Sequence, residues 1–460
     1  MSNNKKLIRI KNELNAIGPG MCLAKWKQVT VHLSTGHTHS CHHPKTHLIP
    51  VEEISIDPSA LHNTSYKKEM RRQMLNGERP SECQYCWNVE DKTNQLEIFS
   101  DRILKSADPY CLDFKDEVIA AGWQHNINPS YLEVSFSYGC NFKCSYCSPE
   151  ISSKWMEEIQ QHGPYPTSRQ FNNIEWFKAD NKMPIPEREE NPFVEAFWKW
   201  WPSLYPSLHT FRITGGEPLM TKHTFKVLDY IIKNPNTQLE LAINSNLGVP
   251  DKLFDDFLKK IKIIEQNRSV KKITIFTSCE AYGKKAEYIR HGLNYDKWLS
   301  NCELLLKEMP QVELVLMSTY NALSVTTYTK FLEDWLMLKK KYAVIQGPNR
   351  RRIDISIPYL RNPEWLTMGI LTDDFLYSAR QSLNFMKQNS LYFLEYEIQY
   401  MQRIYSLFES LMKEPMPNLT TWRKDFVAFV DEHDRRRGTN FLETFPEYSN
   451  FYEQCKLIIR

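Results

Sequence analysis

Short alternating or apolar segments recur along the middle of the chain, and longer segments with helical spacing of apolar residues separate them. The alternating segments predict strands at 131–137, 210–214, 239–244, 272–277, 312–318 and 353–358. The intervening segments predict helices near 150–162, 222–233, 250–263, 294–308 and 325–340. Strands that alternate with helices are typical of βαβ units and a parallel sheet. Six such units predict an α/β fold built as a partial, open (β/α)6 barrel rather than a closed eightfold one.

The two ends of the chain have a different texture. Residues 1–129 are irregular and rich in His, Cys and Pro, with short helical signals such as 66–75. A polar, Pro-containing insertion occupies 164–192, and the pattern beyond about residue 365 is helical and aromatic. We therefore expect three regions: a cysteine-rich region at 1–129, a barrel at 130–364 and a helical region at 365–460.

Composition and charge narrow the class of protein. The chain has 460 residues, of which 42% are hydrophobic and 25% charged, so it can bury a large core. Its net charge of +3 gives no support for a nucleic-acid or membrane-surface partner, and the basic run at 433–437 is expected to be a solvated helix end. The N-terminus lacks a long apolar segment, and no stretch is apolar enough to span a membrane, so a cytoplasmic location is expected.

The eleven cysteines are the most informative residues, because seven of them fall into two spaced groups. Clustered cysteines in a cytosolic chain indicate metal binding or catalysis rather than disulfides. In the first group, Cys140, Cys144 and Cys147 form a C-x3-C-x2-C loop directly after the first predicted strand. Three thiolates can hold three irons of a cubane cluster and leave the fourth iron open, at the strand end where barrel active sites form. Zinc is the rival metal, although it usually takes a fourth protein ligand.

This loop resembles the C-x3-C-x-aromatic-C signature of the radical S-adenosylmethionine (SAM) superfamily, with Tyr146 as the aromatic residue. The resemblance implies a 4Fe–4S cluster whose open iron is chelated by SAM, and a backbone contact of Tyr146 beside the adenine. It also implies an electron donor such as flavodoxin or ferredoxin.

Further motifs of the same superfamily follow the next predicted strands in order. The segment Gly215, Gly216, Glu217, Pro218 resembles the GGEP motif, to which the resemblance assigns contact with the amino group of SAM. After later strands, the resemblance gives contacts to the ribose and carboxylate of SAM to Asn244, Ser245, Asn246, Ser278 and Arg290. Glu280 departs from this pattern, because the superfamily usually has Asp at that position.

The second group consists of Cys22, Cys41, Cys83 and Cys86, and it resembles the auxiliary-cluster pattern of twitch (SPASM-like) domains. Four thiolates can ligate a 4Fe–4S cluster completely. These cysteines precede the barrel, whereas twitch cysteines commonly follow it. A zinc ribbon is the alternative, and the nearby His37, His39, His42, His43 and His47 strengthen it. We expect these histidines to be exposed loop residues, with one near the edge of the metal site.

The other four cysteines are expected to be small buried residues: Cys111, Cys279, Cys302 and Cys455. Cys279 also lies at a strand end that faces the expected cavity. A thiol there could donate a hydrogen atom to a substrate radical, which makes Cys279 a candidate catalytic residue.

Taken with the resemblance, these residues predict an enzyme that cleaves SAM reductively and uses the resulting 5′-deoxyadenosyl radical to take hydrogen from a substrate. A peptide or protein that undergoes oxidation, crosslinking or epimerisation is the expected substrate. A small-molecule dehydrogenase, acting for example on a sugar alcohol, is the alternative, and a zinc-bearing binding protein without activity is a more distant one. The auxiliary cluster would accept an electron from the substrate radical, or it would only tune or stabilise the fold.

Overall fold

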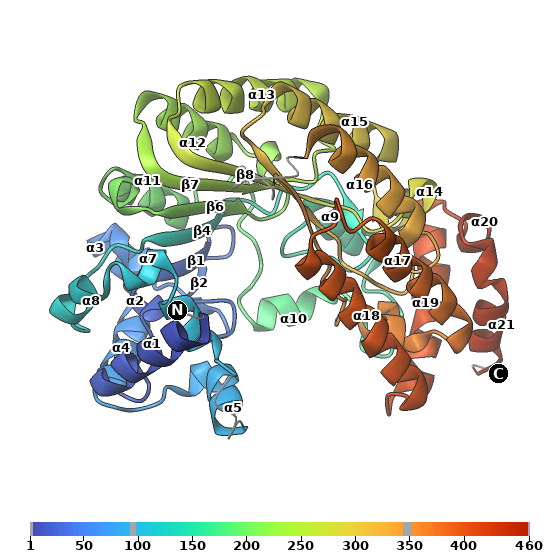
Figure 1. Cartoon of the computed structure of the whole chain (residues 1–460), viewed down its shortest axis with the longest axis horizontal. Coiled ribbons are helices and arrows are strands. Elements are labelled where there is room, and N and C mark those ends of the chain that lie inside the picture. Colours follow the sequence, from blue (N-terminus) through green and yellow to red (C-terminus); the bar gives the residue numbers. More distant parts are fainter. Residues whose placement is uncertain (1–2, 93–97, 344–351, 459–460) are drawn as a thin grey trace.

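The computed structural model describes residues 3–92, 98–343 and 352–458, and it is built around a single nine-stranded sheet. Six parallel strands lie in sequence order within it (Figure 1): β4 (Tyr131–Ser135), β6 (Thr210–Thr214), β7 (Asn236–Asn244), β8 (Val270–Ser278), β10 (Glu313–Met317) and β11 (Ile353–Ser356). All six predicted strands are therefore present, with β7 and β8 longer than expected. The chain has a mixed α/β fold with a largely parallel sheet, consistent with a partial barrel.

The helices that connect these strands cover one face of the sheet. They match the five predicted helices closely: α9 (Ser153–His162), α12 (Lys222–Lys233), α13 (Asp251–Gln266), α15 (Tyr295–Glu308) and α16 (Tyr328–Tyr342). Side-chain caps begin two of them: Ser152 accepts a hydrogen bond from the backbone N–H of Trp155 at the start of α9, and Asn294 accepts one from Lys297 at the start of α15. On β10, buried leucines alternate with half-buried residues, which is the pattern of a strand with one face packed on helices.

The N-terminal region adds to this sheet, which the prediction of irregular structure missed. Strand β1 (Gln28–His32) pairs in parallel with β4, and β2 (His37–His39) and β3 (His47–Leu48) extend the sheet in antiparallel fashion. Most of the other elements are helical: α1 (Asn3–Ile17), α2 (Ala24–Lys27), α3 (Val51–Ile56), α4 (Ser65–Leu75), α5 (Gln84–Lys92), α6 (Asp101–Ser106), α7 (Pro109–Leu112) and α8 (Lys115–Ala121). The helical signal at 66–75 is confirmed as α4. A separate small core, to which α1 contributes Leu7, Ile10 and Leu14, lies beneath these helices.

The predicted insertion is mostly irregular and contains one short helix, whereas the C-terminal region is largely helical. Helices α10 (Ile174–Ala179) and α11 (Pro192–Leu204) lie between β4 and β6, and α14 (Gly283–Ile289) follows β8. The C-terminal helices pack together beside the barrel (Figure 1): α17 (Leu376–Gln388), α18 (Glu395–Lys413), α19 (Leu419–Arg437), α20 (Phe441–Thr444) and α21 (Ser449–Leu457).

The basic run at the end of α19 was expected to be solvated, and this is wrong for two of its arginines. The side chain of Arg435 is 58% exposed, whereas those of Arg436 and Arg437 are 1% and 0% exposed. Arg436 donates to the carbonyl of Gly163 and Arg437 to that of Lys143, so hydrogen-bond acceptors distant in the sequence offset the cost of burying the two charges.

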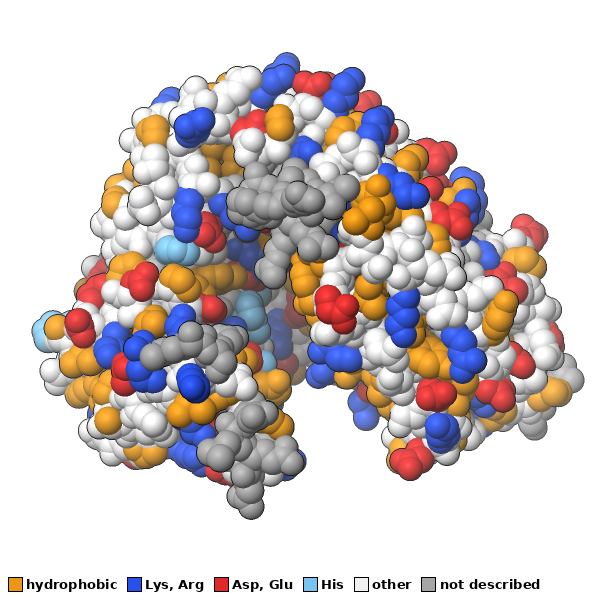
Figure 2. All heavy atoms as spheres, in the orientation of Figure 1, with side chains coloured by type: hydrophobic (Ala, Val, Ile, Leu, Met, Phe, Trp, Pro, Cys, Tyr) orange, Lys and Arg blue, Asp and Glu red, His pale blue; other side chains and the backbone are white. Residues whose placement is uncertain are grey.

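The surface is hollowed between the N-terminal and C-terminal helical parts, and His and basic side chains are visible in its depth (Figure 2). Among the described residues, no helix is long and apolar enough to cross a membrane.

Candidate functional site

The first cysteine group and the strand-end motifs meet at one edge of the sheet. Strands β4, β6, β7 and β8 pair in parallel, so their carboxyl ends lie side by side. The loop of Cys140, Cys144 and Cys147 follows β4, and the segments that begin at Gly215 and Ser245 follow β6 and β7. This is the edge at which active sites of α/β barrels form.

The three thiols of the first group lie close enough to influence one another. Burial raises the pKa of Cys140 to about 12, and the nearby Cys144 thiol adds to this effect. Burial also raises the pKa of Cys147, and both other thiols of the loop add to it. Three mutually repelling, desolvated thiolates need positive charge to become stable, which a bound metal or cluster would supply.

Backbone pairing fixes the shape of the cysteine loop. Strand β5 (Lys143–Cys144) pairs in antiparallel fashion with β9 (Arg290–His291). The indole N–H of Trp155 donates to the carbonyl of Cys144 at 2.8 Å, and the side chain of Asn172 donates to the carbonyl of Cys147 at 3.0 Å. Helix α9 and the insertion therefore hold the loop from the outside.

The two glycines of the GGEP segment allow a very close approach to this loop. A Cβ atom on Gly216 would lie 2.4 Å from the carbonyl oxygen of Gly139, and one on Gly215 would lie 2.6 Å from the hydroxyl of Ser135. Gly215 also has a φ of +120°, a conformation that side chains disfavour. The backbone N–H of Glu217 donates to Gly139 at 2.7 Å, so the two predicted segments are joined directly.

Glu217 organises the loop after β7 from a buried position. Its carboxylate accepts hydrogen bonds from the hydroxyl of Ser245 at 2.7 Å, and from the backbone N–H groups of Leu219 at 3.0 Å and Asn246 at 2.6 Å. Burial raises the pKa of Glu217 to about 7, although these hydrogen bonds oppose the shift. The side-chain amide of Asn246 donates in turn to Asn141 in the cysteine loop at 2.8 Å.

Two further candidates end the neighbouring strands β7 and β8. Asn244 ends β7, and its side-chain oxygen accepts a hydrogen bond from Arg212 at 3.0 Å. Ser278 ends β8 and is half-buried, while Pro218 is buried at the start of a short 3-10 turn. Among the predicted SAM-binding residues, Glu217, Asn246 and Arg290 contact the first cysteine loop directly, and every contact to SAM stays a prediction.

Glu280, the residue that departs from the superfamily pattern, holds Arg290 against the cysteine loop. The guanidinium of Arg290 donates twice to Glu280, at 2.6 and 2.8 Å, and also to the phenol of Tyr146 at 2.6 Å. It also lies 3.6 Å from the sulfur of Cys144. Arg290 is 6% exposed and Glu280 is fully buried, so this network supports the loop from below.

The remaining cysteines are buried. Cys111, Cys302 and Cys455 are each 0% exposed, which confirms the expectation for them. Cys279 is also 0% exposed, and its thiol donates to the carbonyl of Ala281 at 3.4 Å. Burial raises its pKa to about 12. Its role as a hydrogen-atom donor stays a prediction.

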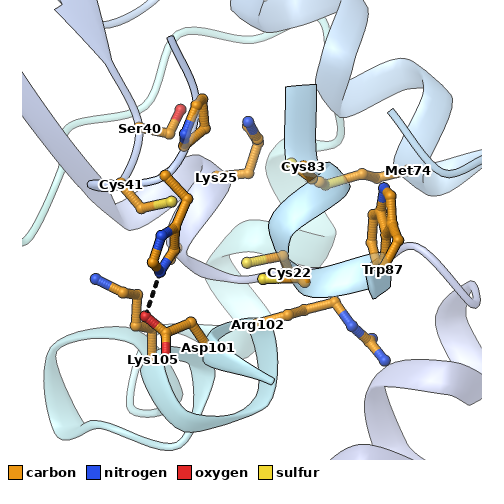
Figure 3. Close-up of a pocket in the computed structure, with 14 residues that line it drawn as sticks. Cys22, Lys25, Ser40, Cys41, Met74, Cys83, Trp87, Asp101, Arg102 and Lys105 are labelled. Carbon is orange, nitrogen blue, oxygen red and sulfur yellow. Dashed lines mark hydrogen bonds and ion pairs between the residues drawn. The ribbon is translucent and has the colours of Figure 1, made fainter. Parts of the chain in front are cut away.

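The four cysteines of the second group line one cavity, although they come from separate parts of the N-terminal region. Cys22 precedes α2, Cys41 follows β2, Cys83 ends the 3-10 turn before α5, and Cys86 lies in the first turn of α5. Figure 3 shows Cys22, Cys41 and Cys83 around the same space. Burial raises the pKa of Cys83 to about 12, and the neighbouring Cys22 and Cys41 add to the shift.

Lys25 lies in this cavity, and sequence reasoning did not identify it. Its side chain is 3% exposed and forms an ion pair with Glu82. Burial lowers the pKa of Lys25, but Cys83, Glu82 and Cys41 outweigh burial and raise it, so the ammonium group stays charged. A cation beside four thiols is the counter-charge that an anionic cluster needs. Spacing gave no signal for Lys25, because it is one of many lysines in the chain.

Among the histidines near the second group, His42 is an exposed loop residue as expected, and the other four differ from that expectation. His37 and His39 are buried in β2, where strand pairing covers them, and His43 and His47 are half-buried. His43 does line the cavity, as expected for one histidine, and its ring bonds to Asp101 at 2.5 Å (Figure 3). In the part of the chain that the structure describes, no three His, Cys, Asp or Glu side chains are arranged to hold a single metal ion.

No family model matches the chain. Curated relatives include the GTP 3′,8-cyclase of Sulfurovum sp. (strain NBC37-1), which is 28% identical over 146 residues, or 30% of this chain and 35% of the relative. The GTP 3′,8-cyclase of Campylobacter jejuni subsp. doylei is 23% identical over 228 residues, or 49% of this chain and 61% of the relative. The chain thus spans about a third to three fifths of the length of these relatives. This distant similarity suggests membership of the radical SAM superfamily and an enzymatic function.

The donor sets agree with that suggestion. Three thiols in one loop fit a cluster with one open iron, and four thiols around one cavity fit a closed cluster. Each set has a cationic group beside it: Arg290 lies beside Cys144, and Lys25 lies beside Cys41 and Cys83. They reduce the electrostatic cost of holding a thiolate-ligated cluster in a buried site.

Proposed function

We propose that this chain is a radical SAM enzyme with two 4Fe–4S clusters. Cys140, Cys144 and Cys147 would bind the cluster that coordinates SAM, and the four N-terminal cysteines would bind an auxiliary cluster. When bound, the first cluster supplies one electron that cleaves SAM to methionine and a 5′-deoxyadenosyl radical, which takes a hydrogen atom from the substrate. The proposed regions are 1–129 for the auxiliary site, 130–364 for the (β/α)6 barrel and 365–460 for the C-terminal helices.

The observation that carries this proposal is the direct contact between the cysteine loop and the GGEP segment. The carbonyl of Gly139, next to Cys140, accepts the backbone N–H of Glu217 at 2.7 Å, and Gly216 leaves no room for a side chain there. Glu217, Ser245 and Asn246 then form a polar, buried wall beside the thiols. Such a wall suits a small zwitterionic ligand such as SAM, whose amino and carboxylate groups need buried polar partners.

A peptide or protein is the proposed substrate, because twitch-type auxiliary clusters commonly accompany peptide maturation. The hollow between the N-terminal and C-terminal parts offers room for an extended chain (Figure 2). A small molecule is the second candidate, and the name of the relatives, GTP 3′,8-cyclase, favours it. We place the enzyme in the cytoplasm, with a flavodoxin or ferredoxin as its electron donor.

Anaerobic reconstitution with iron and sulfide tests the proposal. The protein is expected to turn brown, to hold about eight irons per chain, and to release 5′-deoxyadenosine from SAM under a strong reductant. Cys144→Ala is expected to abolish this release, whereas Cys455→Ala, a change at a buried cysteine outside both groups, is expected to keep it. A colourless, zinc-loaded protein that forms no 5′-deoxyadenosine would establish the binding-protein alternative instead.

The two substrate classes differ in what stimulates SAM cleavage. Deuterium-labelled candidates of each class, including GTP and a precursor peptide encoded beside the gene, are incubated with the reconstituted enzyme. Transfer of deuterium into 5′-deoxyadenosine identifies the substrate, because only the attacked carbon donates its label. Transfer from GTP and not from the peptide would remove the peptide proposal.

A further inference from the structure

The last turn of α19 carries three consecutive arginines that lie in different surroundings. The side chain of Arg435 is 58% exposed and pairs with Glu432, one turn away on the same helix. Arg436 is buried and donates to the carbonyl groups of Gly163 and Pro164. Arg437 is fully buried and points toward the first cysteine loop.

Arg437 makes direct contact with the backbone of that loop. Its Nη1 donates to the carbonyl oxygen of Lys143, the residue before Cys144, at 2.8 Å. Its guanidinium also lies over the ring of Trp155, with 4.7 Å to the ring centroid. Trp155 donates to the carbonyl of Cys144, so Arg437 and its stacking partner hold two successive carbonyls of the loop.

A buried ion network accompanies this contact. Glu158 on α9 accepts from Arg437 at 3.1 and 3.3 Å and from the ammonium group of Lys143 at 2.6 Å. Burial raises the pKa of Glu158, but Arg437 and Lys143 outweigh it and hold the pKa at about 2, so the carboxylate is charged. Two cations and one anion leave this network with a net charge of +1 beside Cys144. Arg290 and Glu280, on the other side of Cys144, form a neutral pair.

We propose that Arg437 is a positioning residue that fixes the first cysteine loop and makes a cluster held there easier to reduce. The inference rests on the proposed function, since it concerns the cluster that these cysteines would bind. A fixed positive charge stabilises the reduced, more negative state of a cluster, and burial strengthens this effect because water does not screen it. The C-terminal helical part is thus an electrostatic component of the radical site rather than only a covering for the barrel.

Four variants separate charge from geometry. Arg437→Gln removes the charge, Arg437→Lys keeps it without the forked hydrogen bonds, and Glu158→Gln raises the net charge of the network. Arg435→Gln is the matched control, because it removes an exposed arginine from the same turn. The readout is the midpoint potential from a redox titration followed by electron paramagnetic resonance, and the relevant cluster is the one whose signal changes when SAM is added.

The equilibrium constant for one-electron reduction of the cluster is expected to fall by about tenfold in Arg437→Gln, which lowers its midpoint potential by about 59 mV. Arg437→Lys is expected to stay near the wild-type potential while binding less iron, and Glu158→Gln is expected to shift in the opposite direction. Arg435→Gln is expected to change neither potential nor iron content. These shifts together would support the inference.

Three results would overturn it. An Arg437→Gln protein with a loaded cluster at the wild-type potential would remove the electrostatic role. Equal shifts in Arg437→Lys and Arg437→Gln would show that charge is not the cause. If Arg437→Gln binds no iron, an unshifted potential in Glu158→Gln decides against the inference. A wild-type protein without any SAM-responsive cluster would instead refute the proposed function.

Discussion

Replacing Glu217 with Gln is expected to remove a pH dependence from the stability of the fold. Burial raises the pKa of Glu217 from 4.5 to about 7 in the folded chain. An acid with a higher pKa in the folded state binds more protons there than in the unfolded state, so it stabilises the fold most at low pH. That stabilisation is fully present below the unfolded value and is lost as pH rises through the folded value.

The magnitude follows from the two pKa values. A shift from 4.5 to about 7 corresponds to about 3 kcal/mol. Between about pH 5 and pH 8, the unfolding free energy of the wild type falls by about 2 to 3 kcal/mol, because the carboxyl of Glu217 ionises more readily in the unfolded chain than in its buried position. Gln has no such dependence. The substitution lowers the unfolding free energy by about 1 to 3 kcal/mol at every pH, because the amide nitrogen of Gln cannot accept one of the hydrogen bonds that Glu217 accepts.

The assay is urea unfolding of the apoprotein, followed by tryptophan fluorescence at several pH values across this interval. The difference in unfolding free energy between wild type and Glu217→Gln is expected to shrink by about 2 to 3 kcal/mol from about pH 5 to about pH 8. Glu175→Gln is the matched control, because Glu175 is 70% exposed and pairs only with Lys178. A difference that stays constant across the interval would show that Glu217 has an ordinary pKa and would refute the reasoning.

Three further predictions concern the cysteine sites. Gly216→Ala is expected to lower the iron content of the first site severely, because its Cβ would lie 2.4 Å from the carbonyl oxygen of Gly139. Gly369→Ala is the control in the same iron assay, because the nearest atom to its Cβ is the end of the Leu411 side chain at 3.3 Å. Replacing Cys83 and Cys86 with Ala is expected to remove about four irons per chain but to keep the paramagnetic resonance signal that responds to SAM. Loss of that signal would contradict the proposal that the two clusters occupy separate sites. Cys279→Ala is expected to keep SAM cleavage within a few-fold, because the thiol is buried; a product that changes in stereochemistry or fails to form would instead support hydrogen-atom donation.

The six core strands and their helices could be predicted because each strand is a short segment of alternating or apolar residues, and helical spacing of apolar residues separates these segments. It did not predict β1, whose residues Gln28 and Thr30 are polar yet buried between β4 and β2. Apolar content is a poor guide for such a strand, because backbone pairing with β4 and β2 holds it in place whatever its side chains are. Helix α1 did carry a signal, since Leu7, Ile10 and Leu14 recur at helical spacing and are buried.

The sequence also identified both cysteine groups, because ligand spacing within a loop is local information. It could not identify the charged groups around them. Arg437 lies 294 residues along the chain from the carbonyl to which it donates. In the sequence it looks the same as its neighbour Arg435, which is exposed. Lys25 is distinguished from other lysines only by the cavity into which it folds. Charges of this kind follow from tertiary packing, and no periodicity reports them.

Glu280 shows how a departure from a motif can be explained by its contacts. Its side chain accepts two hydrogen bonds from Arg290, whose remaining groups bond to Tyr146 and lie against the Cys144 sulfur. An arginine has five N–H donors, so within the described contacts at most one is left for another partner. The resemblance implied that Arg290 binds the ribose or carboxylate of SAM. Its contacts instead favour a role in supporting the cysteine loop. That binding would fall to the groups after β7 and β8, and Arg290→Lys should alter the potential of the cluster more than the affinity for SAM.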